Sequence, residues 1–129
     1  MPHQVIEYSA NLEADLDIDA LVATMHAAAV DVDALPTGGI RTRAARRDIY
    51  RIADCHPDNT FINVTLRLAP RPPEVKQAVG ERLFQTLRDF VQPVFEQRPI
   101  ALSLEIQEID ADFRWKHSNI RDYLARRKN

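Results

Sequence analysis

The chain has 129 residues, of which 45% are hydrophobic and 28% charged, and its formal net charge is −2. We expect one folded domain over residues 1–129, because disordered chains have fewer apolar residues for their charge and two ordinary domains need a longer chain. No apolar run approaches the roughly 18 residues of a membrane span, and the acidic early residues do not fit a signal peptide, so we expect no membrane partner and a cytoplasmic location.

The first elements along the chain are a predicted strand and a predicted helix. Residues 3–9, HQVIEYS, have the composition of a short strand. Residues 16–32, LDIDALVATMHAAAVDV, predict a helix that Asp17 or Asp19 caps at its amino end. Its apolar stripe holds Leu21, Met25 and Val32.

An arginine-rich segment follows the turn that Gly38 and Gly39 mark. Residues 41–51, RTRAARRDIYR, fit two periodicities. A strand would place Arg41, Arg43 and Arg47 on one face, whereas a helix would align Arg43, Arg47 and Arg51. Periodicity alone does not decide, and we favour the strand because it repeats the order seen in the second half.

The second half predicts a strand, a helix and another strand. Residues 60–69 and 100–110 alternate apolar and polar positions, which indicates strands with one buried face each. Residues 72–97 begin with two prolines and predict a helix that Pro93 kinks or ends before its last turn. Its apolar positions are Val75, Val79, Leu83, Leu87, Val91 and Val94.

Together these elements predict an α+β fold with an α/β-like order. Two strand-helix-strand units, over about residues 2–55 and 58–110, would form a four-stranded mixed sheet with two antiparallel helices on one face. The tail, residues 111–129, adds a short helix that begins after a Ser118 or Asn119 cap. Its aromatic residues either anchor the tail or line an apolar pocket. The open sheet face favours self-association, because it exposes apolar side chains.

Pro2 stands directly behind the initiator methionine. Methionine is generally removed before a small residue, so we expect the mature chain to begin with the secondary amine of Pro2. Such a nitrogen can act as a base, as a nucleophile, or have no chemical role. The proline alone does not choose among these.

Several motifs in joint order carry a resemblance. The chain begins Pro2-His3, repeats strand-helix-strand, has Arg41 in the turn GGIRTR and Arg71 before the second helix, and ends with ALSLEI and WKHSNIR. In this order it resembles the tautomerase superfamily, and more closely the 5-carboxymethyl-2-hydroxymuconate isomerases. The resemblance implies a tautomerase-type fold, a homotrimer and an active site at each amino-terminal proline. It also implies that no cofactor and no metal are needed.

The resemblance assigns roles to three residues by position. Pro2 matches the general base, and Arg41 and Arg71 match the two site arginines, although the loop that holds Arg71 is one residue shorter than the family pattern. Arg43, one pleat beyond Arg41, is a further substrate-binding candidate. One arginine would pair with a substrate carboxylate while another stabilises the dienolate formed when a proton leaves carbon. The substrate would be an unsaturated 2-hydroxy or 2-oxo di- or tricarboxylate from aromatic-acid catabolism.

Two other functions remain open from the sequence. One is a trimeric protein with this fold that has lost the chemistry. The other is a module that binds nucleic acid or another anion through RTRAARR, against which stand the negative net charge and the lack of aromatic residues among the arginines. The four histidines show no metal-ligand spacing, and adjacent Cys55 and His56 point apart in an extended chain.

Overall fold

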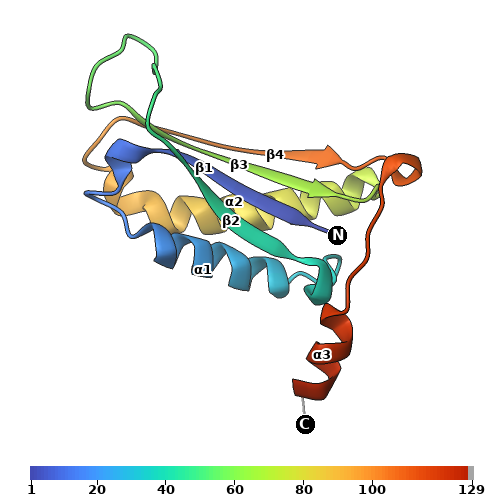
Figure 1. The fold of residues 1–129 in the computed structure, drawn as a ribbon. Helices are drawn as coiled ribbons and strands as arrows, with labels where there is room; N and C mark the ends of the chain where they lie inside the picture. Colours follow the sequence, from blue (N-terminus) through green and yellow to red (C-terminus); the bar gives the residue numbers. More distant parts are fainter. Residues whose placement is uncertain (128–129) are drawn as a thin grey trace.

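The computed structural model describes residues 1–127, which form a four-stranded sheet with helices on one face (Figure 1). The strand order is β2-β1-β3-β4. β1 pairs with β2 in parallel and with β3 in antiparallel orientation, and β3 pairs with β4 in parallel. The strands are β1 (His3–Ser9), β2 (Arg41–Arg47), β3 (Thr60–Leu68) and β4 (Ile100–Glu108).

Two long helices cover one sheet face and the third stands apart (Figure 1). α1 packs against α2 and β2, and α2 packs against β4. Within residues 1–127, three short 3₁₀ turns connect the elements. The helices and turns are α1 (Ile18–Val30), α2 (Pro73–Phe95), α3 (Ile120–Arg127), η1 (Ala10–Leu12), η2 (Thr37–Gly39) and η3 (Ala111–Phe113).

The predicted fold class is confirmed, and the arginine-rich segment is the strand β2. The alternation in β3 is confirmed as well, since its apolar positions Ile62, Val64, Leu66 and Leu68 are all buried. They meet Leu83 and the other apolar positions of α2 in one core that also includes Leu21 and Met25 of α1. The core therefore joins the two halves of the chain.

Helix ends differ from the sequence prediction in two places. α1 begins where expected, because the Asp17 side chain accepts a hydrogen bond from the Ala20 amide at 3.0 Å, but it ends at Val30, before Val32. α2 does not end before its last turn: it continues through Pro93 to Phe95. The proline removes one backbone donor near the helix end, while the Glu96 amide still bonds to the Gln92 carbonyl at 3.1 Å.

The second sheet face is left uncovered by the described chain. It presents Ala101, Ser103 and Glu105 of β4, all exposed, and the half-buried Phe61 of β3. No helix within residues 1–127 combines the length and the apolar character needed to cross a bilayer.

Candidate active site at the amino terminus

Pro2 is buried at the start of β1 and is held by the turn that precedes β2. Its carbonyl accepts a hydrogen bond from the Arg41 amide at 3.0 Å. A β-carbon on Gly39 would lie 3.2 Å from Cδ of Pro2, so glycine allows the turn to pack directly on the proline ring. The second glycine of the predicted turn therefore has a specific use, which is to let β2 and the amino terminus meet.

Two hollows lie at the amino terminus, and Met1 lines both. The first, of about 280 Å³, is lined by Met1, Gly38, Gly39, Arg41, Lys116, His117, Ser118 and Arg121. The second, of about 250 Å³, is lined by Met1, His3, Arg67, Ile109, Phe113, Arg114 and Trp115. Met1 thus contacts two hollows that are rich in positive charge, and it is the residue that precedes Pro2 in the chain.

The electrostatic environment disfavours a charged amine here. Burial lowers the pKa of the Met1 amino group, and the positive charges of Arg114, Lys116, Arg71 and Arg121 lower it further. The pKa of His3 is lowered by burial and by the charges of the neighbouring arginines. Any amine at this end of the sheet is therefore biased toward its neutral, proton-accepting form.

The three predicted site arginines lie in different settings. Arg41 lines the first hollow, and its Nη1 donates to the Gly39 carbonyl at 2.8 Å. Arg43 is exposed, with Nη1 3.2 Å from Nδ1 of His3. Arg41 is thus brought to the amino terminus, and Arg43 lies one pleat farther away.

Arg71 is near the amino terminus but lines neither hollow. Its charge reaches the Met1 amine. Its guanidinium donates to the carbonyls of Ala69 at 3.0 Å and Ala34 at 3.4 Å, so it ties its own loop to the segment between α1 and η2. A direct substrate contact would require the guanidinium to leave these carbonyls.

Reasoning from the sequence assigned no role to Arg114, Lys116 and Arg121. In the structure the tail brings these three cations to the two hollows at the amino terminus. Nη1 of Arg114 is shielded from solvent and has no hydrogen-bond partner within residues 1–127. Phe113 and Trp115 line the second hollow and remain 74% and 85% exposed, so they do not anchor the tail on this chain. The available signal was the run of basic residues in FRWKHSNIR, whose position depends on the path of the tail.

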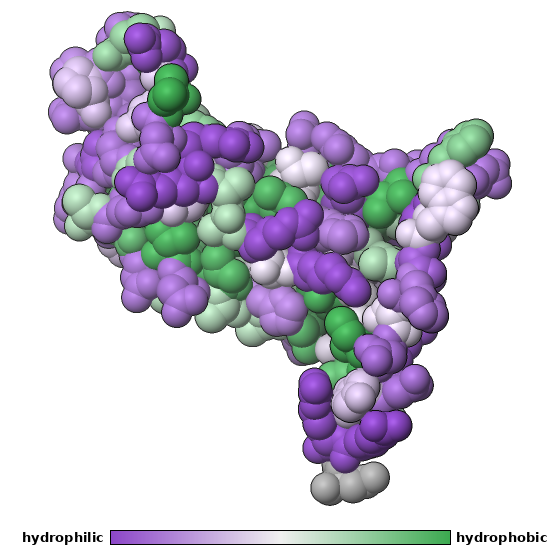
Figure 2. Space-filling view, in the orientation of Figure 1, coloured by the Kyte–Doolittle hydropathy of each residue, from purple (hydrophilic) through white to green (hydrophobic). Residues whose placement is uncertain are grey.

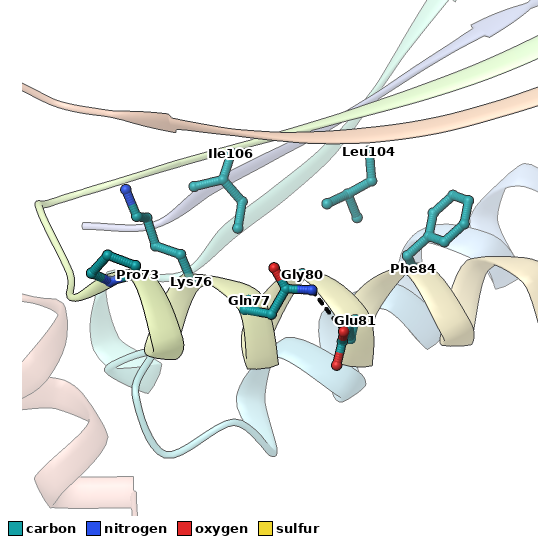
Figure 3. A pocket seen from close by; sticks show the side chains of 8 residues that line it. All are labelled: Pro73, Lys76, Gln77, Gly80, Glu81, Phe84, Leu104 and Ile106. Atoms are coloured by element: carbon teal, nitrogen blue, oxygen red, sulfur yellow. Dashed lines mark hydrogen bonds between the residues drawn. The ribbon is translucent and has the colours of Figure 1, made fainter.

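A hollow larger than these two lies elsewhere, and its polar groups are less free to bind a ligand (Figure 3). It has about 500 Å³ and lies between α2 and the edge strand β4, with Leu104, Ile106 and Phe84 on its apolar walls. Its polar groups are already engaged: Lys76 pairs with Glu108 at 3.4 Å, and Gln77 donates to Glu81 at 2.7 Å. Across residues 1–127, no three His, Cys, Asp or Glu side chains come together as metal ligands.

Comparisons with known proteins give this geometry a family. Residues 2–124 match the model of the 5-carboxymethyl-2-hydroxymuconate isomerase family. The chain belongs to this family. An Escherichia coli protein, a 5-carboxymethyl-2-hydroxymuconate Delta-isomerase, is 31% identical over 121 residues, which cover 93% of this chain and 96% of the relative. By family membership, the chain is an isomerase of the tautomerase superfamily.

Solved structures agree with this assignment. The crystal structure of a 5-carboxymethyl-2-hydroxymuconate isomerase from Deinococcus radiodurans R1 has a TM-score of 0.87 and 35% identity, and the match covers 95% of this chain and 93% of that one. A fused 4-OT described as a symmetric trimer shares the fold alone, with a TM-score of 0.54, 16% identity, and 82% and 85% of the two chains covered. Proteins with the tautomerase fold therefore include trimers.

Proposed function

We propose that this family member is a cofactor-independent isomerase whose general base is the Pro2 nitrogen, freed by removal of Met1. The proposed substrate is an unsaturated 2-hydroxy or 2-oxo di- or tricarboxylate such as 5-carboxymethyl-2-hydroxymuconate. The reaction takes a proton from one substrate atom and returns it to another, which shifts the double bond. A cytoplasmic location remains a prediction from the lack of a long apolar run and of a signal-peptide pattern in the sequence.

The observation that carries the proposal is the place of Met1 between the two basic hollows. Met1 is the one lining residue that they share, and the buried Pro2 follows it directly in the chain. Removing Met1 would join the hollows and leave the Pro2 nitrogen at their junction. A conjugated chain with carboxylates at both ends needs such an elongated site, with a base near its middle and positive charge at its ends.

The same surroundings suit the proposed base. A free α-amino group has a pKa of about 8, and a secondary amine is more basic, so in water it would be mostly protonated at neutral pH. Burial and the nearby cations lower the pKa of the Met1 amine, and we expect them to lower that of Pro2, which is buried more deeply. A downward shift of about 2 units costs only about 3 kcal/mol.

The proposed arginine roles follow from where each guanidinium lies relative to the two hollows. Arg41 lines the first hollow, and it can pair with a substrate carboxylate or stabilise the dienolate oxygen. Arg71 acts on the site through its positive charge. It can contact the substrate only if its hydrogen bonds to the loop carbonyls break. Arg43 is the reserve candidate for binding a carboxylate.

We also propose a homotrimer. Trp115, which is 85% exposed, and Ile49 in the β2–β3 loop, which is 91% exposed, leave apolar surface that a neighbouring copy would bury, and the second sheet face is uncovered. Sedimentation equilibrium on the purified protein should give three times the chain mass. A monomer at micromolar concentration would contradict this proposal.

The arginine-rich strand does not favour the nucleic-acid alternative. Arg47 pairs with Glu7, and Arg46 pairs with Glu13 and Asp48 at 3.2 Å. Phosphate binding would have to compete with these carboxylates. These pairs leave the amino-terminal site as the better-supported location for function.

A direct assay tests the proposed function. Purified mature protein should isomerise 5-carboxymethyl-2-hydroxymuconate after treatment with EDTA, without added cofactor. Because the base must be neutral, kcat/KM should rise with pH and level off above the pKa of Pro2, which we expect burial and the nearby cations to lower. Lack of turnover, or loss of the rate on chelation, would contradict the proposal.

A further inference from the structure

The C-terminal arm, defined here as residues 109–127, contributes half of the first hollow's lining. It leaves the end of β4 and passes the amino terminus before α3, and Figure 2 shows this region standing out from the body of the molecule. Lys116, His117, Ser118 and Arg121 come from the arm, and Arg41 comes from β2. The proposed base and the two site arginines leave the arm cations in the first hollow, Lys116 and Arg121, without an assigned role.

The arm cations have no carboxylate partners in the described chain. Ion pairs within residues 1–127 engage Arg46, Arg47, Lys76, Arg82 and Arg98, together with His56, and none includes Lys116 or Arg121. Both cations act on the Met1 amine through their charge, so both lie near the proposed base. Unneutralised like charges that line one hollow favour an anionic ligand.

The arm is docked on the turn that leads to Arg41. A β-carbon on Gly38 would lie 2.7 Å from Cγ and 3.3 Å from Nε of Arg121, and 3.5 Å from Cδ1 of Leu124. The absent side chain thus lets Arg121 lie across the turn while Leu124 packs beside it. Gly38 thereby places Arg121 and Arg41 in the same hollow.

We propose that Lys116 and Arg121 bind a second carboxylate of the substrate, apart from the one next to the enol. The C-terminal arm would then select di- and tricarboxylates over monocarboxylates. This inference rests on the proposed function, because it concerns the substrate of that same site. The base and Arg41 serve the reacting end of the substrate, and the arm recognises the far end.

The test compares two substrates in mature wild type and in Lys116→Met/Arg121→Met. The substrates are 5-carboxymethyl-2-hydroxymuconate, with three carboxylates, and phenylenolpyruvate, with one. Each variant is assayed where its rate no longer depends on pH, so that a changed base pKa does not enter. We expect the ratio of kcat/KM, tricarboxylate over monocarboxylate, to fall by about tenfold for each cation removed.

Matched variants separate recognition from damage to the arm. Arg126→Met removes a cation from the same helix outside the hollow, where it stacks over Tyr123 at 4.8 Å, and should leave the ratio unchanged. Arg121→Lys should restore part of the ratio lost in Arg121→Met. If the double variant keeps the wild-type ratio, whether both rates fall equally or neither falls, the proposal is overturned.

A binding measurement distinguishes failure of this inference from failure of the proposed function. If wild type turns over neither substrate, the isomerase proposal fails. Calorimetry with unreactive tricarballylate and butyrate then still reports recognition of multiple carboxylates. Tighter binding of tricarballylate that weakens in the double variant would support the arm's role, and equal binding of both acids would refute it.

Discussion

A chain that keeps Met1 should have almost no isomerase activity. Inserting a bulky residue between Met1 and Pro2 prevents methionine removal, and the Pro2 nitrogen then stays in an amide with no basic lone pair. The inserted residue also takes the place that Met1 has in the structure, where it lines both basic hollows. Loss of a general base reduces rates by about 10²–10⁴-fold, and we expect kcat/KM to fall by that amount or more.

Two controls accompany the insertion. Pro2→Ala still loses its methionine and exposes a primary amine, so its rate should lie between those of wild type and the insertion variant. The same residue added at the carboxyl terminus should leave the rate unchanged. Wild-type turnover by the insertion variant would show that the base lies elsewhere.

Replacing Arg41 by methionine should lower kcat/KM by about 10²–10³-fold, the usual effect of removing one preorganised charged donor. The backbone amide of residue 41 still bonds to the Pro2 carbonyl, so the amino terminus should stay in place. Steady-state kinetics also identify the role. A raised KM alone indicates carboxylate binding, whereas a fall in kcat indicates stabilisation of the dienolate.

Arg47→Met is the matched control for this prediction. Arg47 lies on the same strand face as Arg41 but pairs with Glu7, away from the amino terminus. Its replacement should leave both kinetic constants close to those of wild type. Comparable losses in the two variants would mean that strand β2 tolerates neither change, and would remove the support for a specific role of Arg41.

Most of the fold could be predicted because the patterns that indicate strands and helices involve residues close together in the sequence. Alternation marked β3 and β4, and helical spacing marked α2. The arginine-rich segment fitted two periods, and only the repeated order of the two halves favoured a strand. Of the two effects expected of Pro93, a kink or an end before the last turn, the end was wrong, because so near the carboxyl end the missing donor costs only one hydrogen bond.

The structure explains the proximity of predicted site residues only where strand pairing sets the distance between them. Pro2 and Arg41 meet because His3 and Arg41 are paired in the parallel register of β1 and β2. The positions of Lys116 and Arg121 depend on how the arm crosses back over the Gly38 turn, which no periodicity encodes. Arg71, like Pro2 and Arg41, was named from the resemblance, and its bonds to loop carbonyls are visible only in three dimensions.

The most direct test of the central claim compares the state of the amino terminus with activity in the same material. Mass spectrometry of preparations with increasing completeness of methionine removal gives the fraction of chains that begin at Pro2. We predict that specific activity rises in proportion to this fraction and extrapolates to zero when every chain keeps Met1. Full activity in a preparation whose chains all retain Met1 would contradict the account.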